Sequence, residues 1–595
     1  MTEINVNSRK TNPEDKIRFS QLAAYGAGGI IPIALFNVAG ILVGLMGNIS
    51  LGLSAFWLGL ILIIPRLWDA VSDPIIGHLS DNTRTRWGRR RPFLLIGGIL
   101  VAVFFVLIWW VPKGETVHAW FPTDAGFQAF QLIYILVSLL LFYTATTIFE
   151  IPHGALGMEM TTDYHERTRL FSAKSFVGNL FAMSTPWLFA LANLEIFRGT
   201  GGNEADGMRY VSLMVAGLII PLSIWWTMKL REPGFVRIAK QAKTPFWTDM
   251  KHTARNRNFI MLTLTIFTLA MGFNFVSLLG SYIPIFYVFG GDKVAGAYLL
   301  GINGTIWAVT GVLSVFPLNW IAPKIGKRNT LAIAILLMCL AQLSKIVCYN
   351  PSFPYLIIIP TVLLSAGMLF FFTLGSSMVG DICDEDDLKT GKRTEGSFYS
   401  VFWWFIKMGT ALASFITGAL IVLTMFDETQ VTKVDALQGG IRELRKEVQS
   451  WQPGTTPSGT YFQLVEKTKK NSTELKEHLQ TKADETTKSK EHYAVIMKNM
   501  EGVDTRIEKL NATLSPADLD KELENIEKDI TSLTIQSPYT LLMMRVVEIG
   551  LPVLLSLFSI FFVLRYSLTE KRSHEIKDLI KKRNEERATE AIAKG

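Results

Sequence analysis

The sequence predicts an all-α membrane protein whose twelve transmembrane helices form two six-helix halves, with a helical extracytoplasmic insertion between helices 11 and 12. Three observations predict this class. Of 595 residues, 49% are hydrophobic and only 18% are charged, whereas soluble domains carry about 25% charged residues. The apolar residues gather in twelve blocks of roughly 20 residues or more, which is the length that crosses a bilayer. Finally, short charged motifs recur at corresponding places in the two halves.

The predicted helices follow these apolar blocks in chain order. They span residues 19–46, 53–80, 92–112, 127–160, 169–194, 209–230, 257–289, 294–322, 329–349, 355–380, 394–426 and 538–566. Basic connections alternate with nearly uncharged ones. The basic ones are 84–91, 229–257, 324–328, 389–393 and the tail after 565. Cytoplasmic loops carry the excess of Lys and Arg, so both termini are expected in the cytoplasm and segment 427–537 outside.

These assignments divide the chain into six parts. They are the N-terminal half (1–228), a cytoplasmic central loop (229–257), helices 7–11 of the second half (258–426), the insertion (427–537), helix 12 (538–566) and a cytoplasmic tail (567–595). The motif at 166–168, Glu-Arg-Thr, follows helix 4, and a related motif at 393–395, Arg-Thr-Glu, follows helix 10. Two related halves joined by a loop are typical of secondary transporters, which bind substrate between the halves.

The insertion is predicted to be helical and partly coiled-coil. Apolar residues step by three and four from Val434 to Val448 and from Leu519 to Leu533, which is a heptad pattern. Ser515 followed by Pro516 is a good helix start. The segment is acidic, with 16 basic and 20 acidic residues, while the rest of the chain has a net charge of +12. A solvated spacer and a module that binds a protein partner both fit this pattern.

Several function classes are excluded. The net charge of +8 lies in short loops between apolar blocks, which is a feature of membrane topology and not of nucleic-acid binding. The three cysteines have no metal or redox spacing. The chain has neither a phosphate-binding GxxxxGK[ST] motif nor an HExxH motif. We therefore expect a protein that is not an enzyme and has no cofactor.

Asp69, Ser72 and Asp73 form the first candidate site. They sit at i, i+3 and i+4 and so share one face of the second helix. Buried acids in a membrane helix are costly and indicate function, and oxygen ligands suit hard cations. A cation site is the interpretation we favour. Two alternatives stay open: Asp73 caps a kink at Pro74, or Arg66 neutralises Asp69.

Charged and aromatic residues in three other helices are candidates for binding substrate. Glu150 precedes a helix-bending proline and could accept hydrogen bonds from sugar hydroxyls, or it could pair with Lys174. Lys407 lies deep in an apolar stretch and needs a carboxylate, a nearby cation site or a substrate. Trp403 could stack on a sugar ring or simply pack.

The loop after helix 2 is a candidate gate. Asp81 and the arginines Arg89, Arg90 and Arg91 can form ion pairs that differ between two states of a transporter. The arginines also serve as topology signals.

At these residues the chain resembles the glycoside–pentoside–hexuronide:cation symporters, the melibiose-permease group of the major facilitator superfamily. The motifs that carry the resemblance are RLWDAVSDPIIG (66–77), RWGRRRP (86–92), IPHGAL (151–156), ERTRL (166–170) and DEDDLKTGKRTEG (384–396). The resemblance implies sugar uptake coupled to Na⁺, Li⁺ or H⁺. It places the cation on Asp69, Ser72, Asp73 and Thr147, the sugar on Glu150 and Lys174, and Lys407 near both.

Two positions depart from the family pattern. An acid of the first helix is apolar here, near Ile31, and a tryptophan of the fourth helix is Gly154. The expected substrate is therefore a glycoside other than melibiose. We expect an importer in the bacterial cytoplasmic (inner) membrane whose partners are a sugar, a coupling cation (Na⁺ or H⁺) and the bilayer. The alternatives are an exporter or lipid or drug carrier of the same superfamily, and a non-transporting sensor that uses the insertion.

Overall fold

The computed structural model describes residues 16–593 with internal gaps. The gaps are 36–38, 40–42, 44–50, 52, 54, 114, 185–187, 189–190, 193, 199–203, 234–245, 281, 452–458, 486–488 and 511–514. Parts of the predicted first and fifth helices and of the central loop lie in these gaps and so outside the described residues.

Within the described residues the fold is entirely helical, apart from one isolated β-bridge between Thr85 and Gly88. The first half contains α1 (Phe19–Ala27), η2 (Ile30–Leu35), α3 (Ala55–Asn82), α4 (Arg91–Trp109), α5 (Glu115–His118), α6 (Asp124–Glu159), α7 (Tyr164–Ala182), α9 (Glu195–Arg198) and α10 (Glu204–Lys229). The second contains α12 (Phe246–Thr253), α13 (Arg257–Leu279), η3 (Ile283–Val288), α14 (Lys293–Leu313), α15 (Val315–Ile325), α16 (Lys327–Cys348), η4 (Pro354–Ile357), α17 (Ile358–Thr390), α18 (Glu395–Leu423) and α23 (Pro538–Arg565).

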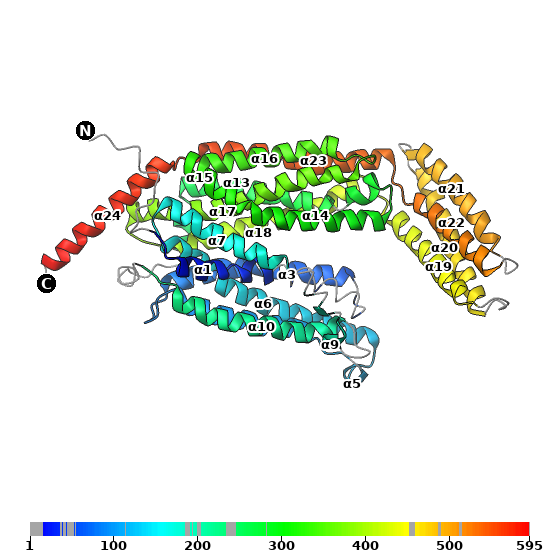
Figure 1. The fold of residues 1–595 in the computed structure, drawn as a ribbon, viewed down its shortest axis with the longest axis horizontal. Coiled ribbons are helices and arrows are strands. Elements are labelled where there is room, and N and C mark those ends of the chain that lie inside the picture. The colour runs from blue at the N-terminus through cyan, green and yellow to red at the C-terminus, as the bar shows by residue number, and fades with distance from the viewer. Residues whose placement is uncertain are drawn as a thin grey trace.

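The long helices run side by side as one bundle (Figure 1). Helices α3, α4, α6 and α10 pack together, as do α13, α16, α17, α18 and α23. Between these groups, α3 and α6 contact α18, and α7 contacts α14, α15 and α17. The helix α24 (Glu570–Ala593) projects from one end of the bundle, here called the α24 end (Figure 1).

Seven of the described helices are long and apolar enough to cross a membrane, and the bent pair α14–α15 makes an eighth. That pair bends by 44°. Two other predicted spans change to π-helix, at Ile30–Leu35 and Ile283–Val288. Both π segments contain a proline, which removes a backbone donor from the hydrogen-bond ladder. The chain is therefore a multi-pass membrane protein with locally broken helices.

The insertion forms four helices at the end of the bundle opposite α24 (Figure 1). They are α19 (Glu428–Gln449), α20 (Gly459–Glu485), α21 (Lys490–Glu508) and α22 (Pro516–Ser532). The two predicted apolar seams are buried in one shared core. The predicted helix start is also present, because Ser515 caps α22 through a bond from the Asp518 N–H. Coiled-coil geometry stays a prediction.

Helices α3 and α18 approach closely at two glycines near the α24 end. A Cβ on Gly77 would lie 2.6 Å from the carbonyl oxygen of Gly396, and a Cβ on Gly396 would lie 2.6 Å from the carbonyl oxygen of Gly77. Backbone atoms cannot rotate away as a side chain can. Contact between the two halves at this end therefore requires the absence of side chains at both positions.

We expect Gly77→Ala to force α3 and α18 apart at the α24 end, since overpacking destabilises a closed contact by about 1–3 kcal/mol. Opening should speed alkylation of Cys383, which is buried at this end in α17. Mass spectrometry after maleimide treatment measures this rate. Gly550→Ala is the matched control, because a Cβ there meets no atom within 4 Å. Equal Cys383 labelling in all three proteins would contradict the prediction.

Candidate functional site

A buried ion-pair cluster joins α3 to α18. The spacing of three and four residues in α3 turns Asp69, Ser72 and Asp73 to one face. Lys407 of α18 reaches this face and pairs with Asp69 Oδ2 at 2.9 Å and with Asp73 Oδ2 at 2.7 Å. Both carboxylates are almost fully buried, at 1% and 0% exposure. The lysine thus has two carboxylate partners, and Asp69 pairs with it instead of with the exposed Arg66.

The oxygens on the other side of the two acids are arranged differently. Thr147 of α6 donates a hydrogen bond of 3.0 Å to Asp73 Oδ1. Asp69 Oδ1 and Ser72 Oγ are buried and have no hydrogen-bond partner among the described residues. Unpaired buried oxygens are unfavourable unless a ligand satisfies them. The four residues that the resemblance assigned to the cation therefore lie together, and two of their oxygens are open to a ligand.

The predicted substrate residues line the next part of the helix interface. Glu150 lies one turn after Thr147 on α6 and is 7% exposed. Its carboxylate interacts electrostatically with Lys174 of α7 and with Lys407. Glu150 forms no ion pair with Lys174, whose ammonium group instead donates to the Tyr399 hydroxyl at 3.2 Å. Both side chains therefore keep polar capacity for a further partner.

Tyr399 of α18 is a site residue that the sequence did not reveal. Its ring lies directly against Gly154 of α6, where an added Cβ would come within 2.0 Å of a ring atom. The ring also meets Trp403 edge-on, with centroids 6.2 Å apart, and Trp403 stacks on Phe372 at 6.1 Å. Trp403 therefore packs within an aromatic group. The missing side chain at Gly154 was the available signal that another ring fills this space.

The cluster contains an odd number of charges. Three buried acids, Asp69, Asp73 and Glu150, face two buried bases, Lys174 and Lys407. With every group ionised the sum is −1. Charge buried in a low-dielectric interior needs compensation, so the arrangement favours one additional positive charge.

A second network closes the α24 end, and we call Asp81, Arg89, Arg90, Glu159 and Glu395 the latch. Arg89 bridges the halves, with ion pairs of 2.6 Å to both Glu159 of α6 and Glu395 of α18. Arg90 bonds Glu159 at 2.9 Å and also pairs with Asp81. Asp81 in turn accepts hydrogen bonds from the first N–H groups of α18. Acids stabilise helix N-termini.

The carboxylates of the latch stabilise the charged form of Arg90. Burial alone would lower the pKa of Arg90, but the carboxylates of Asp81, Glu159 and Glu395 outweigh this effect and raise the pKa above its ordinary value. Arg90 therefore stays charged throughout the physiological pH range.

Arg91 lies apart from the latch. Its guanidinium donates to the Thr227 carbonyl at 2.8 Å, and its backbone N–H bonds Glu232 at 2.9 Å. Glu232 also accepts from the backbone N–H groups of Arg89 and Arg90. These contacts join the first half to the start of the central loop and do not reach the second half. Of the four predicted gate residues, the structure therefore brings three together between the halves.

A related network, which the sequence did not reveal, also joins the two halves, again through a base of the first half and acids of the second. Arg167 of α7 pairs with Asp381 and Asp384 of α17, each at 2.5 Å. Lys327 of α16 pairs with Asp381 at 2.8 Å, and Arg393 pairs with Asp384 at 3.2 Å. The repeated Glu-Arg-Thr and Arg-Thr-Glu motifs were the available signal, since Arg167 and Arg393 belong to them.

The fold is a bundle of membrane-spanning helices in two halves, and a cluster of buried charges lies between the halves. These features are typical of a membrane transporter. Residues 24–444 match the family described as MFS/sugar transport protein. The chain belongs to this family, which consists of transporters and not enzymes. The resemblance to the glycoside–pentoside–hexuronide:cation symporters and the all-α major facilitator fold are thereby confirmed.

Individual relatives are distant in sequence. The chain is 26% identical over 481 residues to an uncharacterized symporter of Synechocystis sp., covering 68% of this chain and 85% of that protein. It is 26% identical over 371 residues to the isoprimeverose transporter of Lactiplantibacillus pentosus, covering 62% and 73%. A bacterial homologue of the iron transporter ferroportin, solved in an outward-facing state, shares the fold with a TM-score of 0.52, 13% identity and coverage of 68% and 92%.

We expect Lys407→Met to lower the stability of the purified protein by about 3–5 kcal/mol, because it leaves two buried acids without their partner. Adding Asp73→Asn should recover part of the loss. Thermal unfolding in detergent measures both. Lys113→Met is the control: it breaks a half-exposed 2.7 Å pair with Asp206 and should change stability by at most about 1 kcal/mol. Equal losses in the two single variants would contradict the argument.

We expect Gly154→Ala to displace the Tyr399 ring and break its bond with Lys174. Uptake activity should fall severalfold or more, since overpacking of a tight contact is destabilising by about 1–3 kcal/mol. The control is Gly217→Ala in α10, where a Cβ meets nothing within 4 Å. Recovery of activity in Gly154→Ala/Tyr399→Phe would argue against a purely steric cause.

Proposed function

We propose that the protein imports a sugar or glycoside together with a cation across the bacterial cytoplasmic (inner) membrane by alternating access. One observation carries the proposal: a buried cluster of three acids and two bases lies where α3, α6, α7 and α18 meet, and it lacks one positive charge. A transported cation supplies that charge. Membership in a family of sugar transport proteins supplies the class of cargo.

The cation binds on the side of the acids that Lys407 leaves open. Lys407 occupies the Oδ2 atoms of Asp69 and Asp73, while Asp69 Oδ1 and Ser72 Oγ have no partner among the described residues. Thr147 completes the set of oxygens through its contact with Asp73. Hydroxyl and carboxylate oxygens suit Na⁺, and a carboxylate alone suits H⁺. Neutralisation of the cluster then favours the state that accepts sugar.

The sugar binds next to this cluster. Glu150 accepts hydrogen bonds from its hydroxyls, Lys174 donates to it, and Trp403 lies against one of its faces. The relative that transports isoprimeverose supports a glycoside as cargo. Tyr399 forms the boundary of the site on the α24 side, because its ring spans from Gly154 to the Lys174 ammonium.

The topology proposed here has twelve spans, with the α24 end in the cytoplasm and the four-helix insertion outside. The basic loops support this orientation. The latch and the Arg167 network then close the cytoplasmic side, and opening toward the cytoplasm requires both to separate. Rocking of the halves about the central site performs this change.

Uptake into right-side-out membrane vesicles tests the function. A panel of labelled glycosides, offered with and without imposed Na⁺ and pH gradients, should show at least one sugar that accumulates only when a gradient is present. Flux of lipids or drugs without response to any sugar would favour the alternative of a carrier of another cargo. Absence of all flux, together with a response that needs the insertion, would favour a sensor.

We expect Asp69→Asn to abolish gradient-driven accumulation, because it removes one acid and with it the net charge of −1 that the cation compensates. Accumulation should fall to the level reached without a gradient, a loss at the upper end of the coupling of about fivefold to 150-fold that is usual between two ligands. Exchange of sugar down its own gradient should be retained in part. Asp124→Asn is the control, since this carboxylate is 87% exposed on the same bundle. Normal accumulation by Asp69→Asn would refute the cation assignment.

A further inference from the structure

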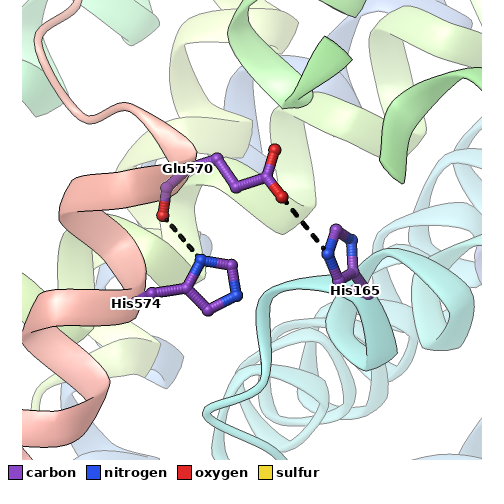
Figure 2. A group of neighbouring side chains, drawn as sticks. All are labelled: His165, Glu570 and His574. Carbon is purple, nitrogen blue, oxygen red and sulfur yellow. Dashed lines mark hydrogen bonds and ion pairs between the residues drawn. The ribbon is translucent and has the colours of Figure 1, made fainter. Parts of the chain in front are cut away.

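Three metal-ligating side chains meet at the α24 end, away from the central site. His165 lies in the first turn of α7, and Glu570 and His574 lie one turn apart at the start of α24 (Figure 2). One ligand atom from each lies within 4.8 Å of the other two. A spacing of four residues places Glu570 and His574 on the same helix face, and this face is turned toward His165.

The hydrogen bonding of the two histidines leaves one nitrogen of each ring available to a ligand. Nδ1 of His574 lies 2.9 Å from the backbone carbonyl oxygen of Glu570, which fixes Nδ1 as the protonated nitrogen and leaves Nε2 with a free lone pair. Metal-binding histidines commonly use their second nitrogen in this way. Nε2 of His165 is buried without a hydrogen-bond partner among the described residues. Its contact with Glu570 Oε1 is long, at 3.4 Å.

We propose that His165, Glu570 and His574 bind a divalent transition-metal ion of the zinc class. Two imidazoles and one carboxylate are a ligand set that Zn²⁺ uses when the fourth position holds water. In a tetrahedral site with ligands about 2.0–2.1 Å from the ion, ligand atoms lie about 3.3 Å apart. The present spacing reaches this value by rotation of the side chains, since all three residues are only partly buried.

The ion joins parts of the chain that belong to different halves. His165 belongs to the first half, and α24 continues from α23 of the second half. Two ion pairs already hold α24 in place: Lys577 with Asp163 at 3.0 Å and Arg583 with Asp387 at 2.8 Å. The metal adds a third link beside the latch. Since opening of the α24 end requires the halves to separate, a bound ion holds this end closed and slows transport.

The binding site is tested on the purified full-length protein by calorimetric titration with Zn²⁺. The wild type should bind one ion, and His165→Gln and His574→Gln should each weaken binding by at least about tenfold. His252→Gln is the matched control, because His252 also contacts a carboxylate, Asp386, at 2.8 Å but belongs to no group of three metal-ligating side chains among the described residues. Absence of saturable binding in the wild type, or equal binding in all variants, would overturn the site.

The effect on transport rests on the proposed function and is measured separately. With Zn²⁺ on both sides of a reconstituted membrane, sugar uptake by the wild type should fall severalfold, and uptake by His165→Gln should be unaffected. Equal inhibition of both proteins, or no inhibition of a wild type that binds Zn²⁺, would overturn the inference that the bound ion holds the α24 end closed. If no sugar is transported at all, the proposed function fails, whereas the titration still decides the metal site.

Discussion

The contact of Lys407 with Asp69 and Asp73 is the interaction on which the arrangement of the two halves depends. It lies in the middle of helices α3 and α18, both of which cross the bundle between its ends. A buried ion pair gains little net stability, but loss of one partner leaves a charge uncompensated. At this level the halves therefore stay together mainly because separating them would leave buried charges without a partner, and less because the ion pairs are strongly attractive. A ligand that changes the net charge of this cluster therefore changes the free energy of the contact between the halves.

The two networks at the α24 end share one feature: in each, a buried base of the first half pairs with buried acids of the second half. In one, a base of the first half, Arg89, meets an acid of the second, Glu395. In the other, Arg167 of the first half meets Asp381 and Asp384 of the second. These groups are buried while the end is closed and would be hydrated if it opened. Desolvation offsets the attraction between buried charges, so the closed and open forms can lie within a few kcal/mol of each other, as a two-state transporter requires.

Helical periodicity allowed local groupings to be predicted, whereas only the family resemblance indicated partners on other helices. Helical periodicity placed Asp69, Ser72 and Asp73 on one face, because residues three and four apart must share it. Lys407 lies 334 residues after Asp73. Its own sequence context showed only that it needs a carboxylate, a nearby cation site or a substrate, and the resemblance alone placed it near both sites. The three arginines illustrate the limit at short range. Consecutive residues do not face the same way, so Arg89 and Arg90 enter the latch while Arg91 turns to Thr227.

The fold itself was more predictable than the site, since bilayer thickness constrains every span, whereas contacts between spans depend on packing. Tyr399 shows this difference. Nothing in its neighbouring sequence marks it as a site residue, and its role follows from a glycine on another helix. His165 and His574 are similar, because one lies in the first half and the other in the tail after the second half, and they meet only through the docking of α24.

Residues 427–537 form a helical unit with a hydrophobic core of its own at one end of the bundle. Its entry and exit are fastened together: the Asp427 N–H donates to Gln536 Oε1 at 3.0 Å, and the Gln430 amide donates to the Leu533 carbonyl at 2.6 Å. Adjacent ends allow an inserted domain to replace a short loop. The hydrophobic core of the insertion contains only its own residues. The two units therefore have separate cores, and the segment that joins α18 to α23 begins and ends at neighbouring points.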